Sequence, residues 1–228
     1  MMKINEKPTG LEYLIYGFMA VVILVGIIWV RVDLDTFKSI YIREDGVLEY
    51  FTSIMLFAAS VLMISRIARI GFSKGAGFVV MSGLIAFLMF FGAGEEISWG
   101  QRILGVESSE FFLENNRQRE TNFHNMEVNG VNLNKLIFGK MLTTFLVLYY
   151  LVLPPLYRRK EGLRNLLDRF YVPVPYLRYG LALLIAGLSI LLVTASKKGE
   201  LNEVCLSVMF FLTLYAPMNA YIYDREDT

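Results

Sequence analysis

Residues 94–125 hold the densest cluster of side chains in this chain that could perform acid/base or metal chemistry. Glu95 and Glu96 directly follow a long apolar run, and Asn116, Glu120 and His124 come later at intervals of four residues. That interval places the three side chains on one face if the segment is helical. Glu120 and His124, the only histidine in the chain, could then bind a single metal ion.

Ionisable side chains at the ends of apolar segments are costly, and they are functional candidates for that reason. One histidine with several carboxylates suits a divalent ion such as Zn²⁺, Mg²⁺, Mn²⁺ or Fe²⁺, which could activate water against an ester or phosphoester. We predict Glu49, Glu95, Glu120 and His124 as metal ligands. The predicted catalytic residues are Glu95, Glu96, Glu120 and His124.

Amide and guanidinium groups accompany these carboxylates and could recognise a polar headgroup. The predicted substrate-binding residues are Arg102, Asn116, Gln118 and Asn125, of which the arginine could clamp a phosphate. Two structural alternatives stay open. The amide-rich segment could be a hydrogen-bonded loop folded over the helix ends, and the glutamate pair could form ion pairs with nearby arginines, fastening the loop to the bundle.

The elements that must position these residues are strongly apolar. Hydrophobic side chains make up 55% of the 228 residues and the mean hydropathy is +0.49, more apolar than a soluble domain. The fold class predicted is therefore an all-α polytopic membrane helix bundle, one domain over residues 1–228. A formal net charge of +1 argues against a nucleic-acid partner, which would need a concentrated basic face.

A spanning helix needs roughly 20 apolar residues, and the chain has room for about six such segments. We predict transmembrane helices over residues 11–32, 47–67, 76–94, 136–157, 177–195 and 204–223, with a polar outer loop over 95–135. Residues 161–176 mix charged, aromatic and proline residues, which is typical of an amphipathic segment in the membrane interface.

The distribution of charge predicts the orientation. In this topology the side that holds the N-terminus has 12 of the 22 basic residues, so both termini are predicted to be cytoplasmic. The 95–135 loop then faces outward. Glu49, Glu203 and the residues predicted for catalysis all fall at this outer face, although they come from different segments.

Three motifs resemble those of a family of uncharacterised bacterial inner-membrane proteins. An EDGxxE element lies at 44–49, EEISWGQR at 95–102 and NxQxExNxHN at 116–125. The resemblance implies a bacterial inner-membrane location and brings no activity with it. The chain is also slightly similar to the glutamate-pair intramembrane proteases, but Arg102 is one residue too distant for their EExxxR motif and a second histidine motif is missing.

The function predicted from these features is a membrane-embedded enzyme, with a divalent metal ion as its candidate cofactor, that acts on a lipid or lipid-linked substrate at the outer face of the inner membrane. The alternative is a non-enzymatic channel, transporter or sensor subunit, which could belong to an envelope-stress or phage-defence complex. Membrane lipids are the predicted partners, and a homo-oligomer or partner subunit is also possible. Small residues in the third segment would permit close helix contacts in each case: Ala76, Gly77, Ser82, Gly83 and Ala86.

Overall fold

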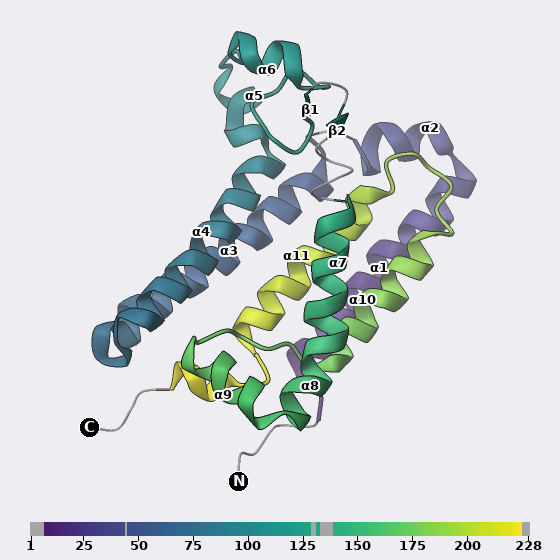
Figure 1. The fold of residues 1–228 in the computed structure, drawn as a ribbon. Helices are drawn as coiled ribbons and strands as arrows, with labels where there is room; N and C mark the ends of the chain where they lie inside the picture. Colours follow the sequence, from purple (N-terminus) through teal and green to yellow (C-terminus); the bar gives the residue numbers. More distant parts are fainter. Residues whose placement is uncertain (1–6, 44, 129–130, 133–138, 225–228) are drawn as a thin grey trace.

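The computed structural model describes residues 7–43, 45–128, 131–132 and 139–224, and nearly all of its secondary structure is helical (Figure 1). Glu44, the first residue of the EDGxxE element, lies outside these residues. The helices are α1 Gly10–Val32, α2 Leu34–Thr36, η1 Phe37–Tyr41, α3 Val47–Ile70, η2 Gly71–Lys74, α4 Ala76–Glu96, η3 Ser98–Gly100, α5 Gln101–Leu104, α6 Glu110–Asn115, α7 Leu142–Val147, η5 Leu148–Val152, α8 Leu153–Arg159, α9 Glu161–Arg169, α10 Leu177–Ile190, α11 Gly199–Tyr215 and η6 Ala220–Tyr223. The two-residue strands β1 Glu127–Val128 and β2 Val131–Asn132 pair antiparallel.

Four helices in the described part of the chain are long and apolar enough to cross a membrane: α1, α3, α4 and the continuous helix Gly139–Arg159 formed around α7, η5 and α8. The prediction of an all-helical chain with apolar helices of membrane-spanning length is confirmed at this level. The other two predicted spans correspond to α10, with 14 residues, and α11, with 17. Both are shorter than the roughly 20 residues that a straight crossing requires.

The sixth predicted segment is displaced along the chain. The prediction placed it at 204–223, but α11 begins at Gly199 and ends at Tyr215. Pro217 disfavours helical geometry in the residue before it, which ends the helix. The completely buried Asn219 then accepts a 2.9 Å hydrogen bond from Val174 N–H and donates one to the Val172 carbonyl. The fifth segment also ends early, at Ile190, and residues 136–138 of the fourth lie outside the described chain.

Helix α11 forms the centre of the bundle. Its buried residues include Leu201, Val204, Met209 and Leu212, which pack in one core with residues of α1, η5, α8 and α10. Close packing is required where α10 meets η5, because a Cβ at Gly180 would lie only 2.4 Å from the Tyr150 carbonyl oxygen. Membrane helices associate through such contacts between small residues, since lipid offers little hydrophobic driving force.

Helices α3 and α4 form an antiparallel pair along one side of the molecule (Figure 1). Two buried serines of α3 join them: Ser53 Oγ donates to the Ala93 carbonyl and Ser60 Oγ to the Ala86 carbonyl, each at 2.8 Å. The small side chain of Ala86 permits this approach, as expected for the small residues of the third segment.

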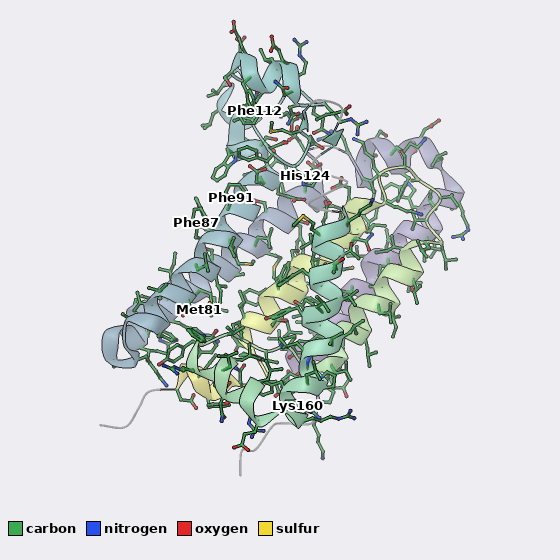
Figure 2. All side chains as sticks on the ribbon, in the orientation of Figure 1. Met81, Phe87, Phe91, Phe112, His124 and Lys160 are labelled. Atoms are coloured by element: carbon green, nitrogen blue, oxygen red, sulfur yellow. The ribbon has the colours of Figure 1, made fainter. Side chains whose placement is uncertain are left out.

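The bundle has two distinct ends. The C-terminal end of α4 and the short helices α5 and α6 lie at one end, and α8 and α9 lie at the other (Figure 1). His124 and Lys160 mark these two ends in Figure 2. The polar residues singled out in the sequence are therefore gathered at the end that α5 and α6 cover.

Candidate functional site

Helix α4 ends at Glu96 in a sharp reversal of the chain. Ser98, Trp99 and Gly100 all have positive φ angles, of 47°, 56° and 72°. The reversal folds the Trp99 ring back onto α4, where a Cβ at Gly94 would lie 2.7 Å from ring atoms. Residues 95–102 consequently form no continuous helix.

Glu95 fastens the loop to the end of α4. It is 4% exposed, and its Oε1 accepts a 2.9 Å hydrogen bond from Trp99 Nε1. Its Oε2 accepts the backbone N–H groups of Phe123, at 2.6 Å, and His124, at 3.2 Å. Both carboxylate oxygens are thus occupied by the loop that Glu95 holds.

The segment that carries Asn116, Glu120 and His124 is not helical. Helix α6 ends at Asn115, and residues 116–126 form turns closed by a bridge between Asn116 and Met126. The expectation that the three residues share one helix face is therefore wrong. The cause is local: the buried Asn116 side chain accepts from Gln118 N–H and donates to the carbonyl and Oδ1 of Asn122, so it replaces helical backbone bonds.

Glu120 is the second anchor of this loop. It is 6% exposed, and its Oε2 accepts from Ser98 Oγ at 2.5 Å and from Asn122 Nδ2 at 3.0 Å. Its other oxygen pairs with Arg102, and Arg102 also pairs with Asp45. Arg102 thus joins the loop to the segment that precedes α3.

A polar cavity of about 520 Å³ lies beneath the loop. Three of the predicted substrate-binding residues line it, Arg102, Gln118 and Asn125, and Asn125 Nδ2 donates to Gln118 Oε1 at 2.5 Å. The fourth, Asn116, does not line the cavity and serves the loop instead. The lining also holds seven acidic residues: Asp45, Glu49, Glu95, Glu96, Glu120, Glu200 and Glu203.

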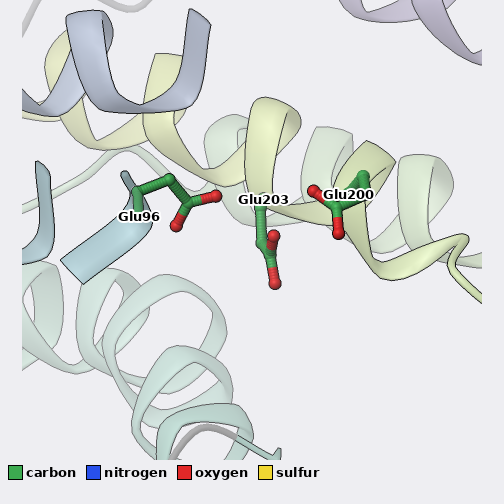
Figure 3. A group of neighbouring side chains, drawn as sticks. All are labelled: Glu96, Glu200 and Glu203. Atoms are coloured by element: carbon green, nitrogen blue, oxygen red, sulfur yellow. The ribbon is translucent and has the colours of Figure 1, made fainter. Parts of the chain in front are cut away.

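Three of these carboxylates form a compact group (Figure 3). One oxygen from each of Glu96, Glu200 and Glu203 lies within 4.8 Å of the others. Glu96 ends α4, whereas Glu200 and Glu203 lie on one face near the start of α11, where the positive end of the helix dipole favours negative charge. No other such group of three His, Cys, Asp or Glu side chains occurs among the described residues.

This group differs from the metal ligands predicted from the sequence. All four predicted ligands line the polar cavity, where Glu95 and Glu120 are hydrogen bonded within the loop, and none of them belongs to the group of three. Glu203 was expected at this face, but Glu200 was missed. Its signal was the i, i+3 spacing of the two glutamates in KKGELNE, a segment interpreted only as a turn.

A second, apolar cavity of about 730 Å³ adjoins the polar one. Its walls come from the membrane-length helices α3 and α4 and from α7, η5, α10 and α11, with residues such as Leu56, Phe91, Leu146 and Phe210. The two cavities share five lining residues: Glu95, Glu96, His124, Gly199 and Glu203. The acidic group therefore lies where a polar chamber meets an apolar one.

The described residues define an all-helical protein with four helices of membrane-spanning length and a two-part cavity at one end of its bundle. In comparisons with known proteins, no family model, no curated protein and no solved structure matches the chain.

Proposed function

We propose that the protein is a metal-dependent membrane enzyme that acts on a lipid or lipid-linked substrate at the outer face of a bacterial inner membrane. In this proposal the chain crosses six times, with α10 and α11 as the two short crossings and both termini in the cytoplasm. One observation carries it: the carboxylate group at Glu96 and Glu203 lies at the junction of a polar and an apolar cavity. A substrate that fits both has a polar head and an apolar chain.

The carboxylate group fits a divalent ion. Three ionised carboxylates at this separation repel one another, and a cation relieves that repulsion. Oxygens on opposite sides of an ion lie at twice the metal–oxygen distance, about 4.2 Å for Mg²⁺ and about 4.6–5.2 Å for Ca²⁺. The oxygens of Glu96, Glu200 and Glu203 lie within 4.8 Å of one another, close enough for one ion to contact all three. Hard oxygen ligands favour Mg²⁺, Mn²⁺ or Ca²⁺ over softer metals.

Such an ion, when bound, supplies a Lewis acid and makes its bound water more acidic. The chain itself supplies the other groups. His124 and Glu49 line the same cavity, where either could take a proton from water or give one to a leaving group. Glu95 and Glu120 are positioning residues, since their hydrogen bonds hold the loop that carries His124 over the cavity. The apolar cavity receives the lipid chain.

The test is the metal content of the detergent-purified full chain, measured by mass spectrometry after dialysis against Mg²⁺, Mn²⁺, Ca²⁺ and Zn²⁺. We expect near-stoichiometric metal in the natural protein. Glu203→Gln and Glu200→Gln should each raise the Kd for the metal at least tenfold, because loss of a charged ligand costs roughly 1.4 kcal/mol or more of binding free energy, and the metal content at limiting metal should fall. Glu114→Gln, an exposed carboxylate on α6 away from both cavities, is the matched control and should retain the metal.

Activity is then assayed as metal-dependent turnover of lipids in mixed micelles. Turnover that disappears in Glu203→Gln and persists in Glu114→Gln supports the enzyme. Absence of metal under these conditions would overturn the proposal. Bound metal without turnover of any lipid would instead favour a metal-binding sensor or scaffold subunit.

A further inference from the structure

We propose that the substrate is an ester-linked lipid, such as a glycerophospholipid, whose ester carbonyl accepts a hydrogen bond from Thr52 in the apolar cavity. This inference rests on the proposed function and names its substrate class. It comes from a buried hydroxyl group for which the described residues provide no partner.

Thr52 is the polar residue of α3 that lines the apolar cavity. It is 3% exposed, and its Oγ1 has no hydrogen-bond partner within the described part of the chain. A helical threonine commonly bonds a carbonyl of the preceding turn, and this hydroxyl does not. Buried polar groups in proteins are nearly always paired, so an unpaired one on a cavity wall indicates a partner that the cavity receives.

The other buried hydroxyls that line this cavity are already paired. Ser207 Oγ donates to the Val204 carbonyl at 2.9 Å. The Tyr150 hydroxyl lies 3.1 Å from Thr213 Oγ1, and the two form a hydrogen bond. Among the buried hydroxyls that line this cavity in the described residues, Thr52 is therefore the one without a partner.

The depth of Thr52 fits the ester region of a lipid. Glu49 lines the polar cavity, and Thr52 lines the apolar one three residues further along α3, about 4.5 Å deeper along the axis. A glycerophospholipid carries its ester carbonyls between the phosphate and the acyl chains. With the phosphate in the polar cavity at the level of Glu49, an ester carbonyl less than one helical turn deeper is at the level of Thr52. A polyprenyl phosphate has no carbonyl there and would leave the hydroxyl unpaired.

The experiment uses two lipids that differ only in these carbonyls: dioleoyl phosphatidylglycerol and its dioleyl ether counterpart. Binding to the full-length, metal-loaded protein is measured by native mass spectrometry in detergent. One neutral hydrogen bond corresponds to about a two- to tenfold preference for the ester lipid. Thr52→Val, which keeps the shape and removes the hydroxyl, should abolish that preference. Thr52→Ser should retain it.

Ser207→Ala is the matched control, because it removes a paired hydroxyl from the lining of the same cavity and should leave the preference unchanged. Equal binding of both lipids by the natural protein, or a preference that survives in Thr52→Val, would overturn the ester inference while metal-dependent turnover still supports the enzyme. Failure of both lipids to bind a metal-loaded, monodisperse protein would overturn the inference and the proposed lipid substrate together.

Discussion

Adjacent glutamates at the end of α4 have different partners. Glu95 is turned into the loop, with both oxygens hydrogen bonded, while Glu96 faces Glu200 and Glu203 across the cavity. Neighbouring helical residues point about 100° apart, so the pair can serve the loop and the cavity together. The loop anchor and the candidate metal ligand are thus separated by one peptide bond.

Glu120→Gln tests whether Glu120 anchors the loop or binds the metal ion. The substitution removes one of the two carboxylate partners of Arg102, leaving Asp45, and weakens the bond from Ser98, so we expect a loss of about 1–3 kcal/mol in the free energy of unfolding. Metal occupancy should change little. Thermal unfolding and metal content, measured on one preparation, give the two readouts. A stable variant that loses its metal would instead make Glu120 a ligand.

The residue types of this site are visible in the sequence, but their partners are not. The concentration of Glu, Asn and His over 94–125 predicts a polar centre, and these residues do gather at one end of the bundle. Which carboxylate faces the loop depends on the reversal at Ser98 and Trp99 and on the side-chain bonds of Asn116. Those interactions join residues far apart in sequence, and helical periodicity cannot predict them.

At the scale of elements, the site is built where helix ends meet. Glu49 lies in the first turn of α3, Glu96 ends α4, and Glu200 lies in the first turn of α11. The boundaries of α1, α3 and α4 follow closely from the apolar runs, within a few residues. Those of α10 and α11 do not. Hydropathy counts apolar residues without regard to backbone geometry, and an apolar run such as 191–195 continues past the last helical residue of α10.

Gly180→Ala tests the contact between α10 and η5, which form two walls of the apolar cavity. The new Cβ would meet the Tyr150 backbone, which cannot move as a side chain can, so we expect a loss of about 1–3 kcal/mol in stability. The matched control is Gly187→Ala on the same helix, where the nearest atom lies 4.0 Å away and alanine should be tolerated. Thermal unfolding in detergent compares them. Equal melting temperatures would contradict the tight contact.

The whole molecule presents apolar side chains outward along its long helices. Leu14 and Ile28 on α1, Phe57 on α3 and Leu88 on α4 are all more than half exposed. A soluble protein would not expose so many large apolar groups, whereas lipid tails would cover them. The sequence predicts this character from hydropathy alone. It does not determine how many helices cross, because α10 and α11 are shorter than the segments predicted from hydropathy.

Cysteine labelling in intact cells tests the proposed topology. Cys205 is the only cysteine, so a Cys205→Ala background has no thiol that could react. In that background Glu114→Cys on α6 should react with an impermeant maleimide added outside, and Asn165→Cys on α9 only after permeabilisation. The two positions lie on helices at opposite ends of the bundle (Figure 1). The reverse pattern would place the cavity on the cytoplasmic side.

Trp99, which packs against Gly94, is an intrinsic fluorescent probe of the site. The chain has two tryptophans, and Trp29 lies beside Tyr41 in another part of the bundle. The Trp99 indole instead packs near Phe90 and Phe91 and donates to Glu95, next to the candidate ligand Glu96. In a Trp29→Phe background, fluorescence from this single indole reports on the packing of the loop against the end of α4, without any attached dye.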